Sequence, residues 1–141
     1  MSSQILLTSA SDADETHDKF SRDYTIHNAS GAGYKLLCVI HGLADAYVLS
    51  KNTTYKWDTC GPHAILLAQG GGVISYKSLC ELAHRDFSIL NKFVDIQIVY
   101  GRDDKPENFD IKNWCNSEGI VAYRSHESLQ RIVNTLKDSY S

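Results

Sequence analysis

Residues 31–50 read GAGYKLLCVIHGLADAYVLS, and this stretch decides the fold class. Its apolar side chains recur at the i, i+3, i+4, i+7 spacing that lines one face of a helix. These positions are Leu36, Val39, Ile40 and Leu43. The end of the stretch, DAYVLS, is rich in β-forming residues and predicts a strand. A helix that leads into a buried strand is typical of an α/β protein.

The sequence that follows predicts the same order again. Residues 55–76 read YKWDTCGPHAILLAQGGGVISY, in which the apolar residues around Ala64–Ala68 predict a helix. The glycines that follow end this helix, because glycine is a poor helix former, and GVISY predicts a buried strand. An acid, Asp58, and the Trp before it stand where the helix begins.

The N-terminal part of the chain supplies two further strands. QILLTSA at residues 4–10 and YTIHNA at residues 24–29 are short apolar runs of the length that strands have. Between them, Ser11 is followed by Asp14 and Glu15 in a spacing that resembles a capping box. This spacing predicts the start of a short polar helix between the two strands.

The C-terminal part completes the alternation. It predicts a short helix near Ser78–His84, a strand at Asp95–Tyr100, a polar loop at residues 101–110 and a strand at residues 119–125. The closing helix has an apolar face made of Leu129, Ile132, Val133 and Leu136. Alternating strands and helices predict an α/β fold, in which helices cover a layered sheet.

Composition limits the functional classes. The chain has 141 residues, enough for one domain with a core, and is 43% hydrophobic and 22% charged. Its formal net charge of -3 argues against a general nucleic-acid binder. The four cysteines form no C-x-x-C pair. Because no signal peptide or membrane-spanning run is evident, we expect a soluble protein of the reducing cytoplasm, with no nucleic-acid or membrane partner.

Asp58 has two interpretations. A carboxylate at a helix start accepts the unpaired backbone N–H groups of the first turn, and an N-cap of this kind needs no function. A carboxylate held stiffly at that place is also a suitable ligand for a hard cation such as Mg²⁺. One carboxylate rarely makes a metal site, so the second interpretation requires further ligands.

The glycines of GAGYK also have two interpretations. Gly31 and Gly33 fit a tight turn from a strand into a helix, or they let the backbone approach an anion at the helix start. Lys35 adds a positive charge about one turn later. Thr53 and Thr54 are either β-forming loop residues or hydroxyl donors to a substrate oxygen.

The histidines carry little signal. Their positions show no H-E-x-x-H or H-x-x-H spacing, so they do not indicate a metal site. His63 lies in the same predicted helix as Asp58 and has the chemistry of a general base. A packed or solvent-facing helix residue is the commoner role for such a histidine, and we expect that role here.

Taken together, these segments resemble the lithium-sensitive, magnesium-dependent phosphatases related to inositol monophosphatase. The resemblance rests on GAGYKLLCVIHGLADAYVLS, on TTYKWDTCGPHAILLAQGGGV and on GIVAYRSHESL. It implies the C-terminal half of the α-β-α-β-α sandwich shared with fructose-1,6-bisphosphatase, with Mg²⁺ as cofactor. It also implies a role in inositol phosphate metabolism and phosphatidylinositol signalling.

The resemblance implies a role for several residues. Asp58 would be a metal ligand, and the substrate-binding residues would be Gly31, Ala32, Lys35, Thr53 and Ser9. The chain departs from the family pattern at Ser11, where the inositol polyphosphate branch tends to have a lysine. The loss of this cation weakens the expected affinity for a second phosphate.

The larger departure is an absence. The other metal ligands of the family are a Glu and an Asp-Pro-x-Asp motif, and this chain contains no Asp-Pro. We therefore expect residues 1–141 to be a single C-terminal subdomain that is inactive alone and has no complete catalytic set. The N-terminal half of the same enzyme would complete the site, and residues such as Leu36 or Ile65 would line an exposed apolar surface. Turnover by this chain would instead point to Asp103, Asp104, Glu107 and Asp110 as ligands.

Three functions compete at this stage. The leading one is a phosphoric monoester hydrolase that removes the 1-phosphate from inositol 1,4-bisphosphate and inositol 1,3,4-trisphosphate. The second is a nucleotidase that acts on adenosine 3′,5′-bisphosphate, since that branch shares a similar Lys-Trp-Asp-Thr-Cys. The third is a module that binds phosphorylated inositols without cleaving them.

Overall fold

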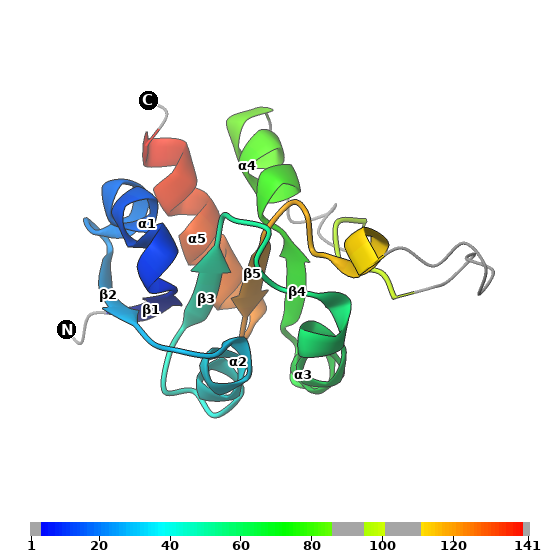
Figure 1. Ribbon diagram of the computed structural model, residues 1–141. Helices are drawn as coiled ribbons and strands as arrows, with labels where there is room; N and C mark the ends of the chain where they lie inside the picture. Colours follow the sequence, from blue (N-terminus) through cyan, green and yellow to red (C-terminus); the bar gives the residue numbers. More distant parts are fainter. Residues whose placement is uncertain (1–3, 86–94, 101–110, 140–141) are drawn as a thin grey trace.

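The computed structural model describes residues 4–85, 95–100 and 111–139 (Figure 1). Its strands are β1 (Gln4–Thr8), β2 (Tyr24–Asn28), β3 (Ala46–Leu49), β4 (Gly72–Ser75) and β5 (Ile120–Tyr123). Its helices are α1 (Ala13–Phe20), α2 (Ala32–Ile40), α3 (Lys56–Ala68), α4 (Tyr76–Arg85) and α5 (His126–Ser139), with the short 3-10 helices η1 (Ala10–Asp12) and η4 (Ile111–Trp114). The α/β class predicted from the alternation is confirmed.

The strands form one mixed sheet in the order β2-β1-β3-β5-β4. β1 pairs in parallel with β2 and with β3, whereas β5 runs antiparallel to both β3 and β4. β1, β2, β3 and β4 therefore point the same way, and their last residues lie along one end of the sheet, which we call the carboxyl end. Ligands of open α/β sheets commonly bind at this end.

Helices cover both faces of the sheet. In Figure 1, α1, α4 and α5 lie on one side and α2 and α3 on the other. Because side chains alternate along a strand, Ala46 and Val48 of β3 face the first group while Tyr47 and Leu49 face the second. All the positions predicted for the apolar face of α5 are buried in the first group: Leu129, Ile132, Val133 and Leu136.

The end of α2 differs from the prediction. Leu36, Val39 and Ile40 are buried, as one apolar helix face predicts, but Leu43 lies beyond the helix and is 68% exposed. The burial of Leu36 contradicts its expected place on an exposed apolar surface, because its side chain packs against the sheet. The helix ends because Gly42 adopts φ 78°, and the Leu43 N–H turns back to the carbonyl of Cys38. A glycine in this conformation stops a helix after its last turn. The periodic pattern was therefore extended one position too far.

Two further predictions about elements are wrong. The segment Asp95–Tyr100 is not a strand, because it pairs with β4 only at one isolated bridge between Gln97 and Ile74. At the start of α1, the N-cap is Asp12 rather than Ser11, because the turn η1 occupies the residues before it. The loop predicted at residues 101–110 lies outside the described residues.

Candidate anion-binding site

A hollow of about 460 Å³ lies at the carboxyl end of the sheet, next to the start of α2. It is lined by segments that follow β1 and β2 and by the first turn of α2: Ser9, Ala10, Ser11, Asn28, Ala29, Ser30, Gly31 and Lys35. Three residues predicted for substrate binding therefore meet in one place. Two other residues predicted for substrate binding, Ala32 and Thr53, are not part of its lining, nor is Asp58, the predicted metal ligand.

The start of α2 supplies anion-binding groups to this hollow. Gly31 precedes the helix with φ 84°, a conformation that other residues rarely adopt, and Ala32 is the first helical residue. Within the described ranges, no side chain caps this helix. The first backbone N–H groups of an uncapped helix are unpaired and carry the positive end of its dipole, so this end favours an anion.

Lys35 is buried, with 2% of its surface exposed. Its Nζ donates to the carbonyl of Ala29 at 2.6 Å and to the Ser9 hydroxyl at 3.2 Å, and it lies 5.1 Å from the centre of the Tyr47 ring. Burial lowers the pKa of Lys35. The ammonium group thus joins the segments after β1 and β2 to α2, and it supplies the positive charge of the hollow.

Tyr47 was missed by the sequence analysis. It is fully buried on β3 below Lys35, and burial is the main reason why its pKa is raised. A hydrogen bond with Ser9 lowers this pKa, while the charges of Asp12 and Asp58 raise it. Tyr47 is therefore close to residues of both the hollow and the start of α3. A tyrosine in a buried strand predicts only core packing, so no sequence signal pointed to it.

Asp58 is the third residue of α3 and not its N-cap, which corrects the first interpretation. Tyr55 precedes the helix, and its N–H donates to Asp58 Oδ2 at 2.9 Å, as in one half of a capping box. The other oxygen, Oδ1, has no hydrogen-bond partner among the described residues. The carboxylate is thus held stiffly at the helix start, with one oxygen available to a ligand.

The two threonines before α3 differ in their surroundings. Thr54 is buried, and its hydroxyl accepts a hydrogen bond from the Asn116 side chain at 3.1 Å. Thr53 is exposed, so its hydroxyl is the one that remains accessible. Beside them, the exposed Trp57 stacks on the Tyr55 ring with a centroid distance of 4.6 Å.

His63 is a buried histidine whose two ring nitrogens are both engaged. Nε2 lies 2.7 Å from Gln97 Oε1, an oxygen that also accepts the Val73 N–H, and Nδ1 lies 2.8 Å from the Tyr100 hydroxyl. Because Gln97 Oε1 only accepts, we assign the proton of the neutral ring to Nε2. Burial lowers the pKa of His63. Of the two common roles expected for His63, packed or solvent-facing, the structure shows the packed one.

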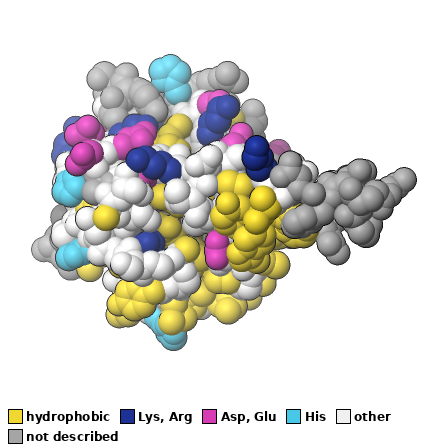
Figure 2. Space-filling view, viewed as in Figure 1, with side chains coloured by type: hydrophobic (Ala, Val, Ile, Leu, Met, Phe, Trp, Pro, Cys, Tyr) yellow, Lys and Arg dark blue, Asp and Glu magenta, His cyan; other side chains and the backbone are white. Residues whose placement is uncertain are grey.

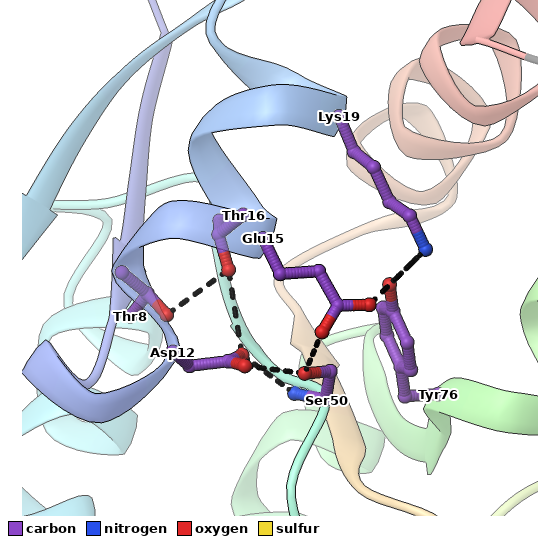
Figure 3. A network of polar contacts seen from close by, with 7 residues as sticks. All are labelled: Thr8, Asp12, Glu15, Thr16, Lys19, Ser50 and Tyr76. Carbon is purple, nitrogen blue, oxygen red and sulfur yellow. Dashed lines mark hydrogen bonds and ion pairs between the residues drawn. The ribbon is translucent and has the colours of Figure 1, made fainter.

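A second polar network includes Asp12, the residue after Ser11 of the hollow, and was not predicted (Figure 3). Its centre is Asp12, whose carboxylate accepts both the backbone N–H and the hydroxyl of Ser50. The Ser50 hydroxyl also lies 2.8 Å from Glu15 Oε2, and this contact is the main reason why the pKa of Glu15 is lowered. Lys19 contacts Glu15 and donates to the Tyr76 hydroxyl. The sequence indicated only that Glu15 belongs to the first turn of a helix.

The described residues do not form a complete metal site. No group of three or more His, Cys, Asp or Glu side chains is arranged to hold a metal ion in that part of the chain. Mg²⁺ prefers six oxygen ligands, and Asp58 offers one free oxygen. The donors therefore fit a divalent cation only with ligands from elsewhere. The acids at 103, 104, 107 and 110 lie outside the described residues. In the described helices, none is long and apolar enough to cross a membrane.

Comparison with known proteins identifies the class. The fold and the helix-terminal hollow define an α/β protein suited to binding phosphate groups. A sequence model of the inositol monophosphatase family matches residues 2–98. The chain belongs to the inositol monophosphatase family. Inositol monophosphatase from Anabaena (Nostoc) has a similar structure, with a TM-score of 0.55 at 16% sequence identity over 96% of this chain and 43% of that chain.

Relatives from two branches of the family are similar in sequence. Inositol polyphosphate 1-phosphatase from Mus musculus is 41% identical over 113 residues, which are 79% of this chain and 27% of that protein. The 3'(2'),5'-bisphosphate nucleotidase 1 from Dictyostelium discoideum is 60% identical over 113 residues, which are 78% of this chain and 27% of that protein. The chain therefore spans about a quarter of the length of these relatives.

Proposed function

We propose that this chain is part of a Mg²⁺-dependent phosphoric monoester hydrolase that removes the 1-phosphate from inositol 1,4-bisphosphate and inositol 1,3,4-trisphosphate. The observation that carries the proposal is the hollow in which Ser9, from the segment after β1, meets Gly31 and Lys35 at the start of α2. The N–H groups of Gly31 and Ala32, the Ser9 hydroxyl and the Lys35 charge would bind a substrate phosphate, and Thr53 would contribute its accessible hydroxyl.

Asp58 would be the contribution of this chain to the metal site. Its stiff attachment to Tyr55 and its free Oδ1 support this role. When Mg²⁺ is bound in such a site, it activates a water and neutralises the leaving oxygen. Since one carboxylate does not hold the ion, we expect the 141-residue chain alone to be inactive or nearly so.

An uncovered apolar face supports a missing partner. Five of the eight large hydrophobic side chains that are exposed in the described part of the chain lie on α2 and α3, namely Tyr34, Leu37, Trp57, Ile65 and Leu67. Figure 2 shows hydrophobic side chains gathered over this side of the molecule. An apolar patch of this kind marks an interaction surface. We propose that the N-terminal half of the same enzyme covers it and brings the other metal ligands to Asp58.

Two alternatives keep specific support. Identity of 60% to a bisphosphate nucleotidase favours adenosine 3′,5′-bisphosphate as the substrate of the same hollow. The incomplete ligand set is what a module that binds phosphorylated inositols without hydrolysis would have. We further propose a cytoplasmic location, because the four cysteines are free thiols, as in a reducing compartment. Lithium inhibition is an additional expectation from the family.

Phosphate release tests the proposal. The purified 141-residue chain and the complete protein are each given inositol 1,4-bisphosphate or adenosine 3′,5′-bisphosphate, with and without Mg²⁺. We expect turnover only by the complete protein, with preference for the inositol substrate. Preference for the nucleotide would support the nucleotidase, and binding without turnover would support the module. Turnover by the short chain would show that its own acids complete the site.

The Asp58 role is tested by substitution in the complete protein. Asp58→Asn keeps an oxygen for the Tyr55 N–H but removes the charge, so the capping contact survives. We expect the Mg²⁺-dependent rate to fall at least about a hundredfold, because loss of a ligand costs no less than loss of its supporting groups. Asp14→Asn, which removes an exposed acid of α1, is the charge-matched control. Equal activity of the two variants would mean that Asp58 only caps the helix and does not bind the metal.

A further inference from the structure

Two loops leave the carboxyl end of the sheet side by side, one after β1 and one after β3. The first contains Ser9, which lines the hollow, and ends at Asp12. The second begins at Ser50 and leads through Thr53 to Asp58. Because β1 and β3 are neighbouring parallel strands, the two loops start close together. Residues assigned to phosphate and metal binding thus lie on both loops.

Asp12 joins these loops through both of its carboxylate oxygens. Oδ2 accepts the Ser50 N–H at 2.7 Å, and Oδ1 accepts the Ser50 hydroxyl (Figure 3). Thr16 donates to the same carboxylate at 3.4 Å. A pair of bonds to the backbone and the side chain of one residue fixes both the position and the orientation of Ser50.

The burial of Asp12 makes these contacts informative. Asp12 is 1% exposed, and its partners are neutral donors, with no ion pair to it within the described ranges. A buried carboxylate without a cation is costly, so it persists only where its hydrogen bonds are needed. The first turn of α1 would tolerate an exposed acid, as it does at Asp14.

Two further hydrogen bonds hold the same loops. Lys51 Nζ donates to the carbonyl of Ser11 at 2.5 Å, and the Asp12 N–H donates to the carbonyl of Ser9 at 3.0 Å. The loop after β1 is thus closed on itself and tied twice to the loop after β3. Glu15 competes with Asp12 only for the single hydrogen of the Ser50 hydroxyl, since the Ser50 N–H contacts Asp12 alone.

We propose that Asp12 is a positioning residue of the phosphate hollow: its bonds to Ser50 hold the loop that leads to Thr53 and Asp58 against the loop that carries Ser9. Asp12 itself does not line the hollow and contacts no substrate. The effect of Asp12 on phosphate binding rests on the proposed function, whereas its effect on the two loops does not. The two effects are tested by separate measurements.

The bonds from Asp12 to Ser50, which we call the Asp12–Ser50 clamp, are tested without any ligand by amide hydrogen exchange, measured by NMR on the 141-residue chain. Asp12→Ala removes both bonds, and we expect exchange of the amides in residues 9–12 and 50–55 to speed up about tenfold or more. Asp12→Asn should restore slow exchange, because its amide oxygen accepts the Ser50 N–H and its NH₂ donates to the Ser50 hydroxyl. Asp14→Ala removes an exposed charge near Asp12 and should leave amide exchange in both loops unchanged.

A second comparison separates positioning from general stability. Ile132→Val lowers stability in the core beneath α5, a cluster that contains no residue of the two loops, and should leave amide exchange in both loops unchanged relative to the rest of the chain. If Asp12→Ala leaves exchange in the loops as in the wild type, or speeds it evenly through the sheet, the proposal is wrong. Should Asp12→Ala not fold, Ser50→Ala, which removes only the hydroxyl bond, gives the same readout with a smaller expected change.

Titration with inositol 1,4-bisphosphate and with inorganic phosphate then tests the consequence. We expect Asp12→Ala to weaken binding of the bisphosphate about fivefold to tenfold while Asp12→Asn and Ile132→Val bind within about twofold of the wild type. Unchanged binding by a variant with mobile loops would overturn the positioning role. Absence of binding by the wild type, with the exchange pattern as expected, would count against the proposed function and leave the clamp established.

Discussion

The two sides of the sheet are built from helices of different character. On the side of α1, α4 and α5, the inner face of α5 is buried and its outer positions, such as Glu127, Asn134 and Asp138, are polar and exposed. On the side of α2 and α3, inner residues such as Leu66 are buried, but Ile65 and Leu67 remain about half exposed. The outer face of the first side is polar and suited to contact with water, whereas the outer face of the second side keeps exposed apolar side chains.

This difference locates the site. Among the described α-helices, α2, which borders the hollow, and α3, which bears Asp58, are the two whose outer faces carry exposed large apolar side chains. Part of the expected apolar surface is confirmed at Ile65, whereas Leu36 is fully buried because it points to the sheet and not outward. The residues that we propose for phosphate and metal binding therefore include the starts of the two helices that we propose are covered by more protein.

The largest expected difference between the two sides is in how much the loss of one isoleucine side chain lowers the free energy of unfolding. Ile132→Ala on α5 removes a fully buried side chain and should lower the free energy of unfolding by about 2–5 kcal/mol. Ile65→Ala on α3 should change it by no more than about 0.5 kcal/mol, because that side chain is already half exposed. Urea unfolding followed by circular dichroism measures both. A large cost at Ile65 would mean that the α3 face is covered in solution.

The turn from α3 into β4 gives a second contrast, between the stability costs of replacing two neighbouring glycines, Gly70 and Gly71. A Cβ on Gly71 would lie 2.1 Å from the carbonyl oxygen of Tyr123, so Gly71→Ala forces the backbone to move and should cost about 1–3 kcal/mol or more. Gly70 has open space but φ 91°, so Gly70→Ala should cost only about 1 kcal/mol. Thermal unfolding ranks the two variants, and the reverse order would contradict the close approach at Gly71.

The uncovered side should also make the chain self-associate. Replacing both Ile65 and Leu67 with Gln removes apolar surface from α3, so we expect the weight-average mass in sedimentation equilibrium to shift towards the monomer. Ile111→Gln changes a similarly exposed apolar side chain in η4, outside α2 and α3, and is the control. A shift of similar size in the control would remove the distinction between the two sides.

The smallest expected effect concerns pH and His63. Its pKa is lowered in the folded state, so the unfolded chain takes up the proton more readily and stability rises with pH. The contribution is complete above the unfolded pKa of about 6.5 and is lost as the pH falls through the folded value. The stability advantage of the wild type over His63→Gln should therefore shrink between pH 7.5 and 5.5. His17→Gln, at an exposed position, is the matched control.

Local patterns predicted most of the fold. The helices α2, α3 and α5 and the strands β1 to β5 appear where apolar periodicity, β-forming residues and glycines indicated them. The failures at Leu43, at Asp95–Tyr100 and at Ser11 share a cause: each depends on a turn or a partner strand rather than on the spacing of side chains. Element boundaries are decided by backbone hydrogen bonds, which sequence spacing records only weakly.

For the site, the sequence by itself determined which residue types stand at the helix starts: Gly31 and Lys35 at α2, and Asp58 at α3. These features are local, because the unpaired N–H groups of a helix belong to its own first turn. Only the tertiary structure decided that Ser9 meets Lys35, that His63 is held by Gln97, and that Asp12 binds Ser50. Those contacts join segments distant in the chain, and their geometry follows from the order and direction of the strands.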